Sequence, residues 1–322
     1  MRVLLTGCAG FIGSNVSHRL LQEGHTVLGL DNLNDAYDIR LKEWRLPSLL
    51  AEPHFEFRQL DITDRQRLSE LFREILPDAV INLAARAGVR QSLKDPWVYY
   101  ETNAIGSLNL LEACRDSGIN KFVLASTSSL YGALNPRPFR EDANTDRPLS
   151  PYAASKKAAE TLCYTYHHLH GIDVTVLRFF TVYGPAGRPD MSYFRFIKWI
   201  AEEEPVVVYG DGSQERDFTY VDDIARGVVL GLRPMGFEVI NLGSDQPNSL
   251  STMIAYLEQS LGKRANLQYE PLDPTDVPAT WADVSKARKL LDWSPQTSFD
   301  KGLQKTVEWY LENRQWACDV NL

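Results

Sequence analysis

Three evenly spaced glycines near the N-terminus constrain this chain most strongly. Gly7, Gly10 and Gly13 follow an apolar run over residues 2–6 and precede a segment with helical apolar spacing. Such glycines permit a tight turn, a close approach of backbone to pyrophosphate, and close packing of helix on strand. The helix start adds unpaired N–H groups and the positive end of its dipole. The pattern therefore predicts a dinucleotide-binding turn.

An acidic residue ends the next apolar run. Residues 26–30 are largely apolar and lead to Asp31, eighteen positions after Gly13. A carboxylate at this strand end accepts hydrogen bonds from an adenosine ribose and repels a 2′-phosphate. The first arginine after it is Arg40, so the sequence favours NAD over NADP.

Strand-length and helix-length segments alternate up to residue 180. Strands are expected at 55–60, 79–83, 121–125 and 174–180, and helices at 64–75, 99–117 and 152–170, while residues 32–53 are expected to be irregular with one short helix. This rhythm predicts an α/β fold, a Rossmann-type doubly wound parallel sheet with ligands at the carboxyl ends of its strands.

The rhythm breaks after residue 180, where glycines and prolines mark a long loop. Segments 222–232 and 238–241 are expected to return to the first domain. We predict an NAD-binding domain over residues 1–180 plus 218–242. Residues 181–217 and 243–322 would form a smaller C-terminal α/β substrate lobe.

Composition narrows the functional classes. The chain has 322 residues and a formal net charge of −8, which argues against nucleic-acid or anionic-membrane partners. No apolar run approaches the length of a membrane span. The four cysteines lack metal or disulfide spacing, and no metal site is expected. We expect a reduced, cytoplasmic protein.

The sequence Tyr152-Ala-Ala-Ser-Lys156 places a phenol and an ammonium one helical turn apart. A nearby ammonium favours the phenolate, so the pKa of Tyr152 is expected to fall toward neutrality. Tyr152 would then be a general base for a sugar hydroxyl. Thr127, at the end of an expected strand, would hold the reacting oxygen beside it.

Several motifs together resemble an extended short-chain dehydrogenase/reductase. They are the glycine turn, Asp61-Ile62, Asn82-Leu83-Ala84-Ala85, Tyr131-Gly132, Tyr152-x-x-x-Lys156 and Arg216-Asp217-Phe218. Within that group the chain is most similar to nucleotide-sugar epimerases that act on UDP-glucuronic acid. The stretches that carry this similarity are 31–35, 84–90, 178–185 and 187–191.

The resemblance implies a reaction and a set of contacts. C4 of UDP-glucuronic acid would be oxidised by tightly bound NAD to a transient 4-keto sugar and reduced from the other face, giving UDP-galacturonic acid. The implied cofactor contacts are Gly7, Gly10, Phe11, Ile12, Gly13, Asp31, Asn32, Asp61, Ile62, Ala84, Ala85, Arg86, Tyr152, Lys156 and Phe179. The implied catalytic residues are Thr127, Tyr152 and Lys156. The resemblance also implies a homodimer built on helices 99–117 and 152–170.

The residues after Thr127 separate relatives with different chemistry. Nucleotide-sugar dehydratases of the group carry Asp-Glu there and UDP-glucuronate decarboxylases carry Ser-Glu, whereas this chain has Ser128-Ser129. Without an extra carboxyl group, dehydration is disfavoured. Ser128, Ser129 and Thr181 could hold a sugar carboxylate by hydrogen bonds, with Arg188 anchoring or guarding the same site.

The resemblance implies only part of the contacts to the nucleotide diphosphate. Arg216 matches a residue that pairs with the pyrophosphate, and Asp276 belongs to the same expected subsite. Many UDP-sugar epimerases have an arginine where this chain has Asp273. Either another arginine, Arg90 or Arg188, replaces it, or the affinity for the diphosphate is weaker. Epimerisation of UDP-glucose and UDP-galactose, decarboxylation of UDP-glucuronate, and a non-catalytic NAD sensor remain alternatives.

Overall fold

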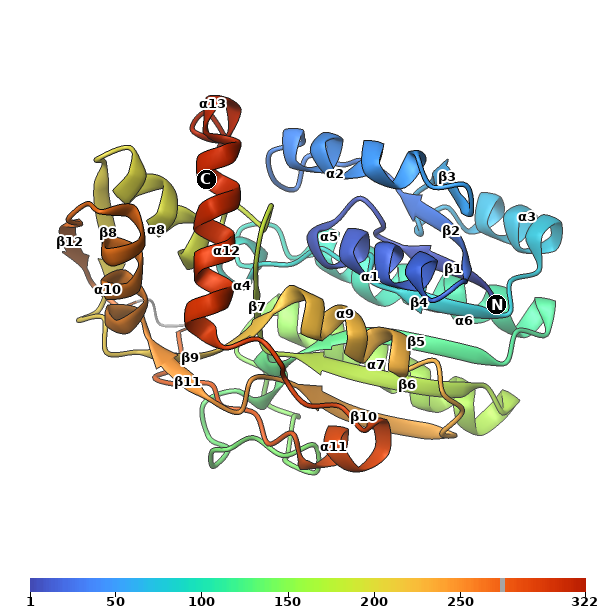
Figure 1. The fold of residues 1–322 in the computed structure, drawn as a ribbon. Helices are drawn as coiled ribbons and strands as arrows, with labels where there is room; N and C mark the ends of the chain where they lie inside the picture. The colour runs from blue at the N-terminus through green and yellow to red at the C-terminus, as the bar shows by residue number, and fades with distance from the viewer. Residues whose placement is uncertain (273–275) are drawn as a thin grey trace.

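The computed structural model describes residues 1–272 and 276–322, and within them a seven-stranded parallel sheet forms the centre of the molecule (Figure 1). Its strand order is β10-β6-β5-β4-β1-β2-β3, and the order reverses between β3 and β4, because β4 pairs with the free side of β1. The strands are β1 Arg2–Thr6, β2 Thr26–Asp31, β3 Phe55–Gln59, β4 Ala79–Asn82, β5 Lys121–Thr127, β6 Asp173–Phe179 and β10 Phe237–Leu242. The predicted Rossmann-type fold is confirmed.

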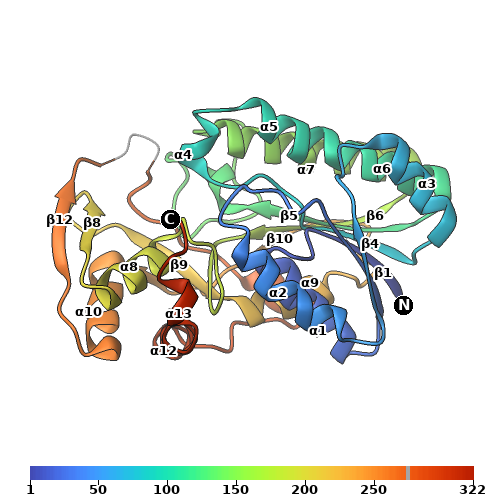
Figure 2. The ribbon, with the colours of Figure 1, turned by 90° about the horizontal axis from the view of Figure 1, so that it is seen from above.

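Helices cover both faces of this sheet, which explains why its central strands are almost entirely apolar. One face carries α3 Arg65–Ile75, α5 Trp97–Tyr99, η1 Tyr100–Ile105, α6 Gly106–Ser117 and α7 Pro151–His170, and the other carries α1 Phe11–Gln22, α2 Arg40–Leu50 and α9 Val221–Leu230 (Figure 2). The short helices α4 Val89–Ser92, η2 Ser128–Tyr131 and α11 Ser285–Leu291 occupy connections. Side chains of β1 and β4 have no exposed surface between Val3 and Leu5 or between Ala79 and Ile81.

A smaller group of elements lies beyond the carboxyl ends of the strands (Figure 1). It comprises β7 Thr181–Tyr183, α8 Ser192–Ala201, β8 Pro205–Tyr209, β9 Glu215–Tyr220, β11 Pro247–Ser249, α10 Leu250–Leu261, β12 Asn266–Glu270, α12 Phe299–Glu312 and α13 Arg314–Ala317. Aromatic side chains dominate its core: Phe218 stacks on Phe299, and Tyr183 meets both edge-on. Strand β10 pairs with β6 of the large sheet, whereas β9 runs through the expected boundary at residues 217 and 218.

The predicted long helix over residues 99–117 is present, but part of it has π-helical geometry. A π-helical segment, η1, precedes α6. In η1, Asn103 donates to Arg86 O and to Ser155 Oγ, and its Oδ1 accepts from the Arg86 N–H. A wider turn placing a polar side chain against neighbouring elements is a common reason for π-helical geometry near a site. None of the described helices is long and apolar enough to span a bilayer.

Candidate active site

The glycine turn is closed by contacts that exclude larger side chains. Gly7 has φ of 73°, in the left-handed region, and its N–H donates to Leu30 O at 2.7 Å. A Cβ on Gly13 would lie 2.0 Å from Gly7 O, and a Cβ on Gly7 would lie 2.8 Å from Ala84 N. The turn therefore holds the backbone at the start of α1 close to the β4 end, leaving a surface without side chains for a phosphate ligand.

Asp31 is held by the turn that it faces. Its Oδ2 accepts the Ala9 N–H at 3.2 Å, while its Oδ1 accepts the Leu33 N–H at 2.8 Å. The Lys42 ammonium lies 3.1 Å from the same Oδ1 and is almost fully buried. Asp31 lines a cavity together with Asn32, Asp61, Ile62, Ala84 and Ala85, so the structure brings these predicted cofactor residues together at the ends of β2, β3 and β4.

A second, larger cavity of about 310 Å³ lies at the carboxyl ends of β1, β4, β5 and β6. The predicted site residues that line it are Gly7, Gly10, Phe11, Ile12, Gly13, Ala85, Thr127, Ser128, Ser129, Tyr152, Lys156, Phe179, Thr181 and Arg188. Gly7, Gly10 and Ala85 line both cavities. The glycine turn thus adjoins the predicted catalytic group in one groove.

The predicted effect of Lys156 on Tyr152 was wrong for the protein without ligand. Burial raises the pKa of Tyr152, and hydrogen bonding with Thr127 and the charge of Arg188 offset only part of that effect. Lys156 Nζ instead donates to Ala125 O at 3.0 Å. Because desolvation of a buried phenolate is unfavourable, one ammonium on the same helix does not lower the pKa of the phenol here.

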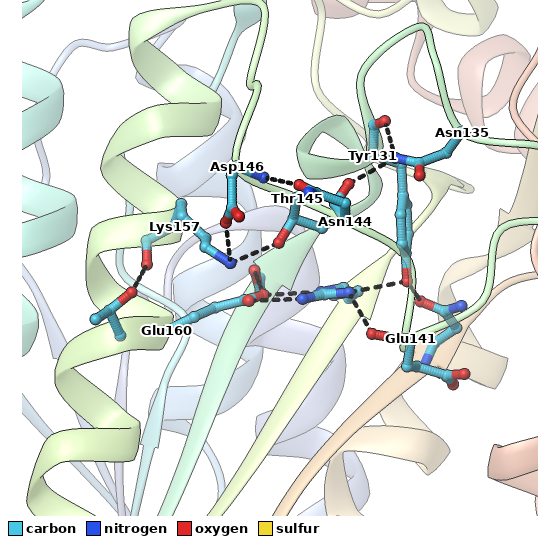
Figure 3. A network of polar contacts seen from close by, with 12 residues as sticks. Tyr131, Asn135, Glu141, Asn144, Thr145, Asp146, Lys157 and Glu160 are labelled. Carbon is cyan, nitrogen blue, oxygen red and sulfur yellow. Dashed lines mark hydrogen bonds and ion pairs between the residues drawn. The ribbon is translucent and has the colours of Figure 1, made fainter.

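A buried ion pair one turn along α7 affects the pKa of Lys156. Its carboxylate, Glu160, is labelled in Figure 3. Burial lowers the pKa of Lys156 to about 8, and the negative charge of Glu160 limits that decrease. Glu160 accepts two hydrogen bonds from the guanidinium of Arg178, at 3.0 and 2.8 Å, and a third from Ser126 Oγ. Arg178 also donates to Tyr131 OH, which donates to Asn241 on β10. The network fixes α7 against β5, β6 and β10.

Polar groups surround Tyr152 on the side of the smaller lobe. Thr127 Oγ1 donates to Ser129 Oγ and accepts the Ser129 N–H, each at 3.1 Å. Arg188 makes a two-bond contact with Asp190, at 3.0 and 2.5 Å. The cavity therefore presents the phenol together with the hydroxyls of Thr127, Ser128, Ser129 and Thr181 and the guanidinium of Arg188, a set suited to an anionic sugar.

Three predicted substrate residues lie together outside these two cavities. Arg90 Nη2 lies 2.6 Å from Asp276 Oδ2, and Arg216 Nη2 lies 3.8 Å from Asp276 Oδ1. Arg90 also lies over the Tyr209 ring, 4.1 Å from its centroid. Asp273 lies outside the described residues. Arg86 lines neither cavity. Burial opposes ionisation of Asp61, but hydrogen bonds from Thr63 and Asn32, together with the charge of Arg86, lower its pKa.

The sequence reasoning missed several lining residues between β2 and α2. Tyr37 lines both cavities, and Lys42 reaches Asp31 from the next helix. The available signal was the dense run of Asp and Asn after β2, where side chains cap turns and leave the chain irregular. No group of three His, Cys, Asp or Glu side chains suited to a metal occurs among the described residues.

A wound sheet with a glycine turn, a half-buried tyrosine and a buried lysine on one helix, and a cavity that all three line defines a class of dinucleotide-dependent enzymes that act on hydroxyl groups. The model of the NAD dependent epimerase/dehydratase family matches residues 3–243, and the chain belongs to this family.

Particular relatives are similar over nearly the whole chain. A UDP-glucuronate 4-epimerase of Thermodesulfobacterium geofontis is 58% identical over 311 residues, which are 96% of each chain. The crystal structure of UDP-glucuronic acid 4-epimerase from Bacillus cereus, in complex with UDP-glucuronic acid and NAD, matches with a TM-score of 0.92 and 39% identity, covering 97% of this chain and 100% of that one. UDP-glucose 4-epimerase of Thermotoga maritima, solved with UDP-glucose, matches with a TM-score of 0.90 and 31% identity, covering 98% and 100%.

Proposed function

We propose that this protein is an isomerase that interconverts UDP-glucuronic acid and UDP-galacturonic acid at C4, using tightly bound NAD. The observation that carries the proposal is the cavity in which Tyr152 lies among Thr127, Ser128, Thr181 and Arg188, beside the glycine turn. The relatives named above support the choice of sugar nucleotide and cofactor.

The residues present fit NAD. The glycine turn leaves backbone free for a pyrophosphate, and Asp31 at the end of β2 suits an adenosine ribose. When bound, NAD supplies the acceptor for the C4 hydrogen and returns it to the sugar. Asp61, Ile62, Ala84 and Ala85, which line the cavity around Asp31, would border the adenine side.

Tyr152 acts as the proton carrier at the C4 oxygen. Its phenolate removes the hydroxyl proton during oxidation, and the phenol returns it during reduction. Thr127 holds the oxygen in place, while the positive charge of Arg188 favours the phenolate. Because the 4-keto sugar is reduced within the same site, the reaction is redox-neutral overall.

Ser128, Ser129 and Thr181 hold the sugar carboxylate. A 4-ketouronate is a β-keto acid, and it loses carbon dioxide when the breaking C–C bond aligns with the keto π system. Hydrogen bonds from three hydroxyls keep the carboxylate out of that alignment. The absence of an acid at position 129 leaves no group there for the additional proton transfer of elimination.

Arg216 binds the diphosphate, together with Arg90. Their guanidinium groups lie on opposite oxygens of Asp276, and their donors suit phosphate oxygens. Asp276 accordingly orients the two arginines.

The nucleotide-sugar lobe comprises residues 181–217 and 243–322, and the NAD domain comprises 1–180 with 218–242.

Incubation of purified protein with UDP-glucuronate, UDP-glucose and their C4 epimers, followed by separation of the products, tests this function. The proposal predicts UDP-galacturonate from UDP-glucuronate at a much higher rate than epimerisation of UDP-glucose. A pentose with carbon dioxide would instead identify a decarboxylase. Retained NAD without turnover would identify a sensor.

We also propose a cytoplasmic homodimer. Trp97, Tyr100 and Ile105 follow one another along α5 and η1 with 77%, 41% and 49% of their surfaces exposed, and Tyr164 of neighbouring α7 is 55% exposed. Free buried thiols at Cys8, Cys114 and Cys163 suit a reducing compartment.

Light scattering tests the assembly. A variant carrying Trp97→Glu and Ile105→Glu should have the mass of a monomer, whereas Leu134→Glu, on a loop and 78% exposed, should retain the mass of a dimer. A wild-type monomer would contradict the proposed assembly and leave the proposed reaction standing.

A further inference from the structure

The segment between β2 and β3 touches both parts of the molecule. Trp44 Nε1 donates to Asn313 Oδ1 at 3.2 Å, and the Asn321 N–H donates to Asp38 Oδ2 at 2.9 Å. Figure 1 shows α2 beside the end of the chain at α13. Lys42 of the same segment reaches Asp31 in the cofactor cavity. The segment therefore connects the NAD domain to the smaller lobe.

Arg45 is a buried residue of this segment that bonds to both parts of the molecule. Its side chain is buried, with 3% of the residue exposed. Nη1 donates to Ala9 O in the glycine turn at 3.1 Å and to Tyr37 OH at 2.9 Å. Nε and Nη2 both donate to Ala186 O, at 3.1 and 2.5 Å. One planar guanidinium thus joins the cofactor turn to the loop after β7.

Arg45 makes no ion pair with an acidic residue in the part of the chain that the structure describes. Its donors are used on backbone carbonyls and a phenol, an arrangement that specifies geometry through a fixed fork of N–H groups. Its positive charge also lies next to the turn at the N-terminus of α1, where the helix dipole favours anions.

The loop that Arg45 holds carries Arg188. Ala186 has φ of 50°, an unfavourable value for a residue with a Cβ, so this turn depends on contacts that over-determine it. Other contacts also hold the loop: the Arg188 N–H donates to Tyr193 OH, the Arg188 guanidinium donates twice to Asp190, and the Met191 N–H donates to Arg188 O. Arg188 lines the same cavity as Tyr152, and its charge offsets part of the increase that burial causes in the pKa of Tyr152.

We propose that Arg45 is a positioning residue for the reaction: it fixes the Ala186–Arg188 turn against the glycine turn, and so sets the placement of Arg188 beside Tyr152. This inference rests on the proposed function. Beyond that function, the inference states that Arg45 fixes the position of the Ala186–Arg188 turn relative to the glycine turn, although Arg45 itself contacts neither the sugar nor the nicotinamide.

Two substitutions separate the fork of donors from its charge. Arg45→Lys keeps the charge but cannot reach Ala9 O, Tyr37 OH and Ala186 O together, and Arg45→Met keeps most of the volume. Arg226→Met is the matched control, because Arg226, on α9, also donates to a backbone carbonyl, Ser294 O, and is mostly buried, with an additional ion pair to Asp223. All variants are compared as full-length proteins with NAD as purified.

We expect Arg45→Lys to retain NAD in near wild-type amount and to lower kcat by about 10- to 100-fold, the effect of a small misplacement in a catalytic site. The acidic limb of the kcat profile should move to higher pH, since an Arg188 charge displaced from Tyr152 offsets less of the increase that burial causes in the pKa of Tyr152. Arg226→Met should change neither. A purely structural role would reduce the active fraction and leave the limb unmoved.

A double-mutant cycle with Arg188→Lys tests whether Arg45 acts through Arg188. If it does, Arg45→Lys adds little to the loss already caused by Arg188→Lys. Full additivity, an unmoved acidic limb, or Arg45→Lys activity equal to that of the control would overturn the proposal. Failure of both Arg45 variants to reach a wild-type melting profile would overturn it in favour of a structural role.

The proposed function is tested separately by wild-type protein. Absence of UDP-galacturonate from wild-type reactions contradicts the function itself. Normal wild-type turnover with unaffected Arg45 variants contradicts only the role of Arg45.

Discussion

The two halves of the active site are built in different ways. The cofactor half follows from a local segment: strand, glycine turn, helix and acid lie within residues 1–31 and come together through main-chain contacts such as Gly7 N–H to Leu30 O. The sugar half is assembled from side chains at 127–129, 152, 181 and 188, which lie on separate elements. The first half depends on backbone shape and the second on hydroxyls and charges, so substitutions should affect them separately.

The largest effect should come from removing the proton carrier without disturbing the cofactor half. Tyr152→Phe should lower kcat by about 10²- to 10⁴-fold, the usual contribution of general acid–base catalysis, while NAD content stays at the wild-type level. Absorbance of released NAD and a coupled assay measure the two quantities. Near-normal turnover would contradict the role of Tyr152.

Gly13→Ala should weaken NAD binding and leave the catalytic side chains in place. Its Cβ would lie 2.0 Å from Gly7 O, a backbone atom that cannot yield cheaply. We expect about 2–3 kcal/mol of overpacking at the turn, seen as protein that purifies with little NAD and regains activity only at high added NAD. Gly118→Ala is a control, since its Cβ would meet nothing within 4 Å, although its φ of 68° adds some local strain. Full retention of NAD by Gly13→Ala would break the comparison.

Thr181→Val and Ser128→Ala test the carboxylate subsite, each in a separate protein. Loss of a hydrogen bond to a charged group costs about 1.5–3 kcal/mol, so kcat/KM for UDP-glucuronate should fall about 10- to 100-fold. A pentose should also appear among the products, because the carboxylate is freer to align with the keto group. Product analysis by NMR measures both. An unchanged kcat/KM with no pentose would show that the hydroxyls of Thr181 and Ser128 do not hold the carboxylate.

The smallest expected effect is a shift in the pH dependence of kcat when Glu160 loses its charge. Glu160 opposes the lowering of the Lys156 pKa by burial. Glu160→Gln removes that negative charge, so the pKa of Lys156 falls further below about 8, and the alkaline limb of kcat moves to lower pH by about one unit. Glu112→Gln, whose carboxylate pairs with Arg115 away from the cavity, is the control. If the alkaline limb of the kcat–pH profile does not move in Glu160→Gln, Glu160 has no effect on the catalytic step.

The difference between the halves also explains what the sequence could predict. Strand and helix periods and the glycine spacing are local, so the sheet, the turn and Asp31 were predictable. The expected lowering of the Tyr152 pKa failed because burial is a property of the whole fold and outweighs one neighbour. Arg45 and Lys42 were missed because their partners, Ala186 and Asp31, are brought near by packing that no local pattern records.

The most direct test of the central claim uses UDP-glucuronate carrying deuterium at C4. If one site oxidises and reduces the same carbon with Tyr152 moving the proton, UDP-galacturonate should keep the deuterium at C4, and unlabelled substrate in heavy water should gain none there. Loss of the label to solvent, or a pentose as the main product, would contradict the account.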